Sequence, residues 1–109
     1  MKKSISLLLL SLCLVARADI VGSTTTKIID IFAYSEYGNG DVTVRVATPV
    51  VGCDAGYFLQ KSDPGFNATL ALLMNAKAAQ TDVVVYGKTE VLWTGSAGKY
   101  CKLYGVNLR

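Results

Sequence analysis

The stretch Asp63–Gln80, DPGFNATLALLMNAKAAQ, decides the fold, because its pattern predicts a helix more clearly than any other part of the chain after residue 18. Asp63 suits the N-cap, since its carboxylate can accept hydrogen bonds from the first-turn amides, and Pro64 suits the first helical position. At about 100° per residue, one face collects Phe66, Leu70, Leu73 and Lys77. We expect this face to pack on the core.

The opposite helix face is small and weakly polar, carrying Asn67, Asn75, Ala68, Ala71, Ala78 and Ala79. A face so poorly adapted to water suggests packing against another surface, such as the same helix of a second copy. The predicted oligomer-interface residues are Asn67, Ala71, Asn75 and Ala78. The alternative is an exposed alanine-rich face that only favours helix formation.

Residues 1–18 have the pattern of a secretory signal peptide. Two lysines precede an apolar run from Ile5 to Val15, and Ala16-Arg17-Ala18 places small residues where a signal peptidase reads them. Cleavage after Ala18 would leave residues 19–109 as one domain. The apolar run is too short to span a bilayer. We therefore expect a secreted or periplasmic protein without membrane insertion.

Charge argues against a nucleic-acid partner. The 11 basic residues include Lys2, Lys3 and Arg17, so eight remain after cleavage, equal to the 8 acidic residues. A formally neutral domain offers no basic stripe to neutralise phosphates, so no nucleic acid is expected as a partner.

The cysteines predict a disulfide. Cys13 leaves with the signal peptide, so Cys53 and Cys101 remain as a pair in an oxidising compartment. Closing this loop should stabilise a small single-core domain by about 4 kcal/mol. A metal or redox pair is the alternative, but the chain has no histidine and the two cysteines are far apart in sequence. No cofactor and no metal are expected.

Runs of β-branched and aromatic residues predict strands at residues 26–34, 42–47, 50–59, 82–86 and 99–108. Tyr37-Gly38-Asn39-Gly40-Asp41 predicts a turn that makes the first two strands a hairpin. Glycines in the third segment suggest a bulge or bend. The last two strands are joined by a connection carrying Val91-Leu92-Trp93 and a glycine-rich turn at 94–98.

Three strands, a helix and two more strands is the order of the OB-fold, a five-stranded Greek-key barrel. We therefore expect an all-β domain with one helix in that arrangement. The bridge between Cys53 and Cys101 would then tie the third strand to the fifth. A β-sandwich with one additional helix is the alternative.

Several features between Ile28 and Leu108 occur together with the signal peptide: Cys53 before the helix, the Leu/Ala-rich helix Phe66 to Ala79, the strand Val83 to Tyr86, Trp93 in the next connection, and the closing segment Cys101 to Leu108. In this combination the chain resembles the B subunits of bacterial AB5 toxins of the subtilase-cytotoxin and typhoid-toxin type. It is more distantly similar to the binding subunits of pertussis toxin.

This resemblance implies an OB-fold protomer in a homopentameric ring, with helices lining the pore, cell-surface glycans bound on the outside and an enzymatic A subunit carried above. In the family, a hydroxyl residue near the start of the first strand contacts sialic acid. Ser23, Thr24, Thr25 and Thr26 occupy that region, and Thr25 is the best single match. The chain departs from the family in having few residues before this run, and the run is alternatively a solvated linker.

A sugar site needs aromatic faces beside hydroxyls and amides, and Tyr37, in a polar turn, is the tyrosine most expected to be accessible. No catalytic residue is predicted, because the chain lacks histidine and its carboxylates are scattered. The sequence thus favours a glycan-binding toxin B subunit involved in virulence. The alternative function is a monomeric secreted OB-fold protein with a structural or inhibitory role and no sugar site.

Overall fold

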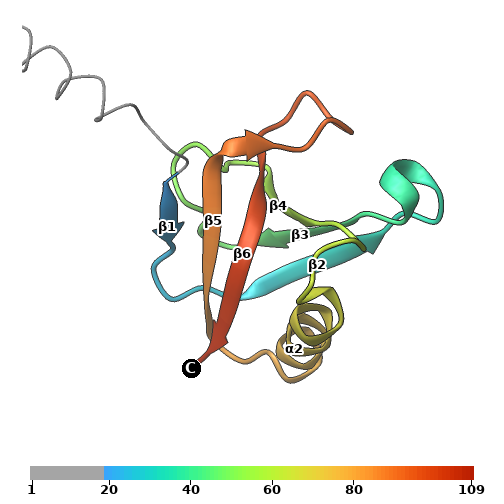
Figure 1. Cartoon of the computed structure of the whole chain (residues 1–109). Helices are drawn as coiled ribbons and strands as arrows, with labels where there is room; N and C mark the ends of the chain where they lie inside the picture. Colours follow the sequence, from blue (N-terminus) through green and yellow to red (C-terminus); the bar gives the residue numbers. More distant parts are fainter. Residues whose placement is uncertain (1–18) are drawn as a thin grey trace, which may run out of the picture.

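Residues 19–109, the part that this computed structural model describes, form six β-strands and one α-helix (Figure 1). The predicted signal peptide, residues 1–18, lies outside the described residues. The elements in chain order are β1 (Ile20–Gly22), β2 (Ile28–Ala33), the short 3-10 helix η1 (Tyr37–Asn39), β3 (Val42–Val46), β4 (Gly56–Leu59), α2 (Phe66–Ala79), β5 (Val83–Leu92) and β6 (Tyr100–Leu108). The prediction of a mostly-β domain with one helix is confirmed for this range.

The strands form one mixed sheet in the order β1-β5-β6-β4-β3-β2. β4 and β6 run parallel, and the other neighbouring pairs run antiparallel. The predicted hairpin is the β2–β3 pair. The expected contact between the third and fifth predicted strands is the β4–β6 pair, in which Tyr57 lies opposite Cys101.

The sheet is not closed into a barrel, and the prediction of a closed five-stranded barrel is wrong in this respect. β1 and β2 follow one another in the chain but form the two edges of the sheet. β1 adds a strand that was not predicted, by pairing with β5. The chain then bends at Thr25, and only Thr26 returns to β5, through two 2.8 Å backbone hydrogen bonds with Val83. Because of this bend, no continuous ladder joins the two edges.

The third predicted strand, 50–59, is shortened to β4. Residues 50–55 form turns, in which the Cys53 amide donates to the Val50 carbonyl at 2.9 Å and the Gly56 amide donates to the Cys53 carbonyl at 3.0 Å. Gly52 has a φ of 95°, which takes the chain out of the extended conformation. Gly52 therefore marks a tight turn before β4, which agrees with the predicted bend and not with a bulge.

The fourth predicted strand, 82–86, is extended to Leu92. β6 pairs with β5 from Val83 to Lys88 and again at Leu92, with register irregularities after Tyr86 and after Lys88. Val91 and Leu92 therefore belong to the strand, although they were assigned to the connection. Only Trp93 and the residues after it form the loop.

The helix begins later than predicted, because Asp63 is not its cap. The N-cap is Gly65, without a side-chain capping bond. Asp63 instead accepts a hydrogen bond from the Gln60 amide at 2.8 Å and forms a 2.6 Å ion pair with Lys102. A carboxylate that meets an ammonium gains a stronger hydrogen bond than one that meets a neutral amide. The ion pair with Lys102 therefore holds the Asp63 carboxylate away from the helix N-terminus.

α2 lies against β2 and β6 (Figure 1). It buries Leu73 and Ala76 fully and Phe66 and Leu70 partly, in a core shared with strand residues such as Val44, Val83 and Val85. Lys77 was placed on this face too, but its side chain is exposed, so it does not pack on the core as the face was expected to do. In the last helical turn the ammonium reaches solvent, where it also complements the negative end of the helix dipole.

The predicted disulfide is confirmed: Cys53 and Cys101 are bonded, with Cα atoms 5.3 Å apart, and both are fully buried. Next to it lies the buried ring of Tyr57, packed so tightly on Gly87 that a Cβ there would come 2.6 Å from Tyr57 Cε2. The turn before β4, the disulfide and the Tyr57–Gly87 contact together hold β4 against β5 and β6.

Candidate binding site between two loops

Two loops meet at one end of the sheet: the β2–β3 loop, which contains η1, and the β5–β6 loop, which begins with Trp93. The first loop is compact, since Gly38, Asn39 and Gly40 have positive φ and the amides of Gly40 and Asp41 both donate to the Tyr37 carbonyl. This is the turn predicted from the Gly-Asn-Gly sequence. Its geometry presents the side chain of Tyr37 to the second loop.

Side-chain hydrogen bonds join the two loops. The indole Nε1 of Trp93 donates to Asp41 Oδ2 at 2.8 Å, and the hydroxyls of Tyr37 and Thr94 share a bond of 2.8 Å. Asp41 is only 2% exposed, and among the described residues its Oδ1 has no hydrogen-bond partner. A buried carboxylate with one bonded oxygen makes the junction a polar centre in an otherwise apolar cluster.

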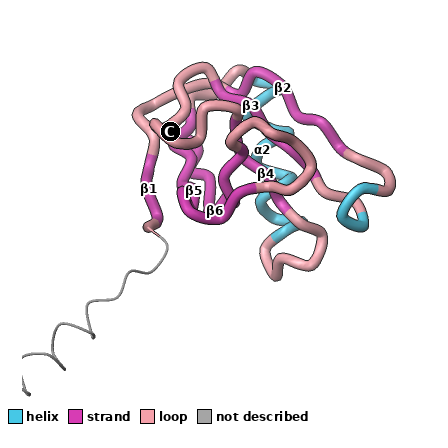
Figure 2. Tube along the Cα trace, turned by 90° about the horizontal axis from the view of Figure 1, so that it is seen from above, coloured by secondary structure: helices cyan, strands magenta, loops and turns pink. Residues whose placement is uncertain are grey.

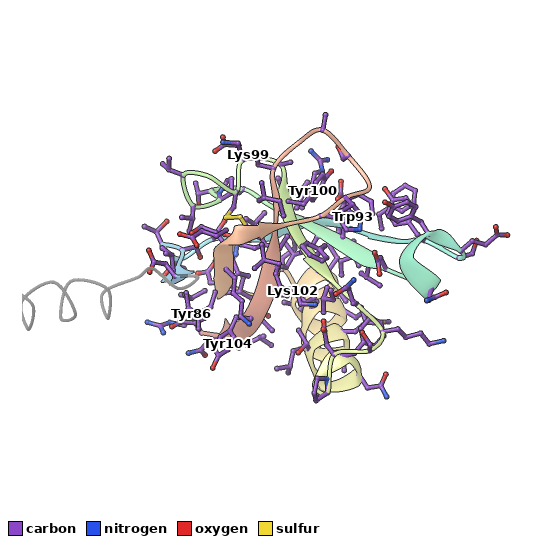
Figure 3. The ribbon with its side chains drawn as sticks, turned by 45° about the horizontal axis from the view of Figure 1, so that its top comes forward. Tyr86, Trp93, Lys99, Tyr100, Lys102 and Tyr104 are labelled. Atoms are coloured by element: carbon purple, nitrogen blue, oxygen red, sulfur yellow. A yellow bond between two sulfur atoms is a disulfide. The ribbon has the colours of Figure 1, made fainter. Side chains whose placement is uncertain are left out.

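Five aromatic side chains surround this junction. The ring of Trp93 lies 5.2 Å from Tyr34, 5.4 Å from Tyr37 and 5.4 Å from Tyr100, measured between ring centroids. Phe32 stacks on Tyr34 at 4.3 Å and extends the row along β2. Figure 3 shows Trp93 and Tyr100 side by side at the root of the β5–β6 loop. We call Phe32, Tyr34, Tyr37, Trp93 and Tyr100 the aromatic cluster.

The cluster is buried at its centre and open at its margin. Trp93 is 5% exposed, whereas Tyr37 is 44% and Phe32 is 56% exposed. Exposed aromatic faces beside hydroxyl groups are what a carbohydrate needs, because pyranose rings stack on aromatic faces while hydroxyls and amides replace the hydrogen bonds of water. The cluster therefore has the features that suit a small, polar ligand such as a sugar.

The predicted Ser/Thr run is partly occupied in holding the fold. The Ser23 hydroxyl accepts a hydrogen bond from the Val85 amide at 3.1 Å, and the buried Thr26 hydroxyl accepts one from the Thr48 amide at 2.9 Å. Thr24 and Thr25 are exposed. Of this run, therefore, Thr24 and Thr25 present their side chains most openly to a ligand.

The structure does not bring Thr25 and Tyr37 together. The segment between β1 and β2 lies at one end of the domain and η1 lies at the other, in two views at right angles (Figures 1 and 2). Within one protomer, the predicted hydroxyl run and the predicted tyrosine belong to different surfaces. The partners of Tyr37 are Trp93 and Thr94. These two residues were assigned from the sequence to the connection between the last two strands. The signal for a role in the site was a tryptophan next to a glycine-rich turn.

The predicted interface residues of α2, Asn67, Ala71, Asn75 and Ala78, are all exposed. Two larger apolar side chains flank them on the outer face, Leu72 at 40% exposed and Met74 at 57% exposed. Lys77 is the sole charged residue of the helix. The outer face is more apolar than its alanines suggested.

Two other ion pairs are exposed surface contacts. Lys27 pairs with Asp82 at 2.6 Å, and Arg45 pairs with Asp30, whose hydrogen bond raises the pKa of the guanidinium. Among residues 19–109 there is no group of His, Cys, Asp or Glu arranged to hold a metal. Nor does any helix in this range have the length and hydrophobicity needed to cross a bilayer.

A comparison of the chain with protein-family models gave no match, and comparisons with curated proteins and with solved structures gave none either.

Proposed function

We propose that this chain is an exported carbohydrate-binding subunit that works as a homo-oligomer, in the manner of a receptor-binding B subunit of an AB5-type toxin. The observation that carries the proposal is the aromatic cluster, where exposed Phe32 and Tyr37 lie beside the Tyr37–Thr94 hydroxyl pair. In this proposal the ligand is a cell-surface glycan, sialic acid included among the sugars to test. An enzymatic A subunit is the partner that such a ring would deliver.

The strand order supports an OB-type interpretation. If β1 is set aside, β2, β3, β4, β6 and β5 follow one another in the sheet, and β4 and β6 are parallel. The Thr26–Val83 bridge brings the segment just before β2 against β5, where an OB barrel would close. OB-folds bind oligosaccharides with the loops after their first and fourth strands. In this chain those loops are the β2–β3 and β5–β6 loops, which carry the aromatic cluster.

The outer face of α2 supports assembly, with a second copy of the chain as the occupant. Asn67, Ala71, Asn75 and Ala78 carry no charge, so bringing the same face of several copies together creates no repulsion. The neighbouring Leu72 and Met74 would leave water on contact. Export fits the buried disulfide, which belongs in an oxidising compartment.

A glycan array tests the proposal most broadly, with the wild-type protein compared with Phe32→Ala, Tyr37→Ala and Thr25→Ala. Loss of binding in Phe32→Ala and Tyr37→Ala places the sugar at the aromatic cluster. Loss in Thr25→Ala alone moves the site to the Ser/Thr run. Val51→Ala is the matched control, because Val51 is 91% exposed and lies outside the aromatic cluster and the Ser/Thr run. A stable wild-type protein that binds no glycan contradicts the proposal, and a monomer by light scattering favours the structural or inhibitory alternative.

A further inference from the structure

A hollow lies away from the aromatic cluster, between the start of α2 and strands β5 and β6. Its volume is about 200 Å³. It is smaller than the roughly 300 Å³ at which pockets for drug-sized ligands begin, so it suits a single small group. Its apolar lining comes from Leu59, Phe66 and Leu103, and its polar lining includes Asp63, Thr69, Lys88 and Lys102.

Two lysines face each other at this hollow. Lys88 on β5 and Lys102 on β6 are register partners in the antiparallel pair. Like charges placed directly opposite each other destabilise a sheet. A negative charge beside either ammonium group offsets this repulsion.

Only one of the two ammonium groups has an anionic partner. Lys102 Nζ donates to Asp63 Oδ1 at 2.6 Å and to Gln60 Oε1 at 3.0 Å. Lys88 Nζ lies 5.8 Å from the ring centroid of Tyr104, and within residues 19–109 it forms no ion pair or hydrogen bond. Asp63 neutralises Lys102, so the hollow keeps a net positive charge, which resides on Lys88. Lys102 and Tyr104 are labelled in Figure 3.

The start of the helix has the same electrostatic sign. The N-cap of α2, Gly65, has no side-chain capping bond, since Asp63 points to Lys102. The positive end of the helix dipole therefore faces the hollow without a carboxylate of its own.

We propose that this hollow binds the oxyanion of a small ligand, a carboxylate or a phosphate group, through Lys88. Tyr104 forms the aromatic wall under the ammonium, and Thr69 offers a hydroxyl at the helix start. The site is independent of the aromatic cluster and of whether that cluster binds sugar.

The test is an NMR titration of the exported protein with sodium phosphate and, separately, sodium acetate, at constant ionic strength set with sodium chloride. We expect saturable amide shifts at Gly65, Thr69 and Tyr104. Lys88→Gln should weaken binding about tenfold or more, a loss of about 1.4 kcal/mol, and Lys88→Arg should retain it. Lys99→Gln, a matched change at an exposed lysine away from the hollow, should bind as the wild type does.

The two anions separate the sources of the ligand: saturation by phosphate alone assigns a phosphate ester, and saturation by acetate assigns a carboxylate. Shifts that do not saturate with either anion overturn the proposal, and so do equal affinities for wild type and Lys88→Gln. A thermal scan gives a second readout. Without added anion, Lys88→Gln should be at least as stable as wild type, because a like-charge pair is removed. A lower Tm with unchanged anion binding would assign Lys88 to packing and overturn the proposal.

Discussion

The indole N–H of Trp93 donates a 2.8 Å hydrogen bond to Oδ2 of Asp41, although the two residues lie 52 positions apart in the chain. This bond ties the β5–β6 loop to the β2–β3 loop beneath the exposed rings of the aromatic cluster. Because Asp41 is buried and its Oδ1 has no partner among the described residues, the carboxylate depends on Trp93 for its one side-chain hydrogen bond.

Asp41→Ala should therefore lower the free energy of unfolding by about 1–3 kcal/mol, since it leaves the buried indole N–H without an acceptor. Asp41→Asn keeps an oxygen acceptor and removes a buried charge, so its loss should be smaller. Urea unfolding followed by fluorescence measures both, and Trp93 is the only tryptophan of the chain. Equal stabilities for Asp41→Ala and wild type would show that this bond contributes nothing.

Residue preferences within short segments predicted the helix and most of the strands. Contacts between residues distant in the sequence determine where these helices and strands begin and end. The Gly38-Asn39-Gly40 turn and the β2–β3 hairpin follow from backbone preferences that a short sequence expresses. The cap role of Asp63 could not be excluded from sequence, because Lys102, which draws its carboxylate away, is 39 positions distant.

Contacts between distant residues also limited how much of the aromatic cluster the sequence could predict. Tyr37 was identified from its polar turn, but its meeting with Trp93 and Thr94 depends on which strands are neighbours in the sheet. The Ser/Thr run appeared uniform in sequence, yet Ser23 and Thr26 are bonded to the amides of Val85 and Thr48, respectively. These hydrogen bonds separate Ser23 and Thr26 from the exposed Thr24 and Thr25, although all four residues have the same kind of side chain.

Gly87→Ala should destabilise the domain by about 1–3 kcal/mol, because its Cβ would come 2.6 Å from a ring carbon of buried Tyr57. Gly105→Ala is the matched control on the neighbouring strand, where an added Cβ meets nothing within 4 Å. Urea midpoints give the comparison. A neutral Gly87→Ala together with a destabilised Gly105→Ala would reverse the expected order and contradict this packing.

Alkaline pH should lower the stability of the domain through Tyr57. Burial raises the pKa of its phenol, and the bond with the Val50 amide opposes this more weakly. A raised folded-state pKa means that the contribution of Tyr57 is fully present below the unfolded pKa of about 10 and is lost as pH rises above it. Tyr57→Phe should lose less stability than the wild type as the pH rises above about 10. Identical pH profiles for variant and wild type would contradict this assignment.

The disulfide should account for about 4 kcal/mol of stability by the chain-entropy argument. The double variant Cys53→Ala/Cys101→Ala measures the loss by urea unfolding, since the two cysteines are bonded and buried. Thiol counting on the denatured, unreduced exported protein should find no free thiol. Two free thiols per chain would show that the bridge does not form.

Ala71→Glu and Ala78→Glu should break the oligomer and leave the protomer folded, because the glutamates of neighbouring copies would be confined together. Val51→Glu is the control, a charge placed at a 91% exposed side chain away from α2. Light scattering gives the mass and circular dichroism the fold. An unchanged assembly mass in both helix variants would remove α2 from the interface.

The central claim, that the aromatic cluster binds sugar, is tested most directly by the fluorescence of Trp93 during titration with a glycan selected from the array. Trp93 touches Tyr37 and Tyr34 and lies under the proposed site. We predict a saturable change with a Kd near 1 mM for each site, or about −4 kcal/mol, raised by roughly 10² to 10⁴ in avidity on a multivalent surface. Tyr37→Ala should abolish the change, while Val51→Ala should keep it. Glycan binding by a stable oligomer without any response of Trp93, and with full affinity in Tyr37→Ala, would contradict the account.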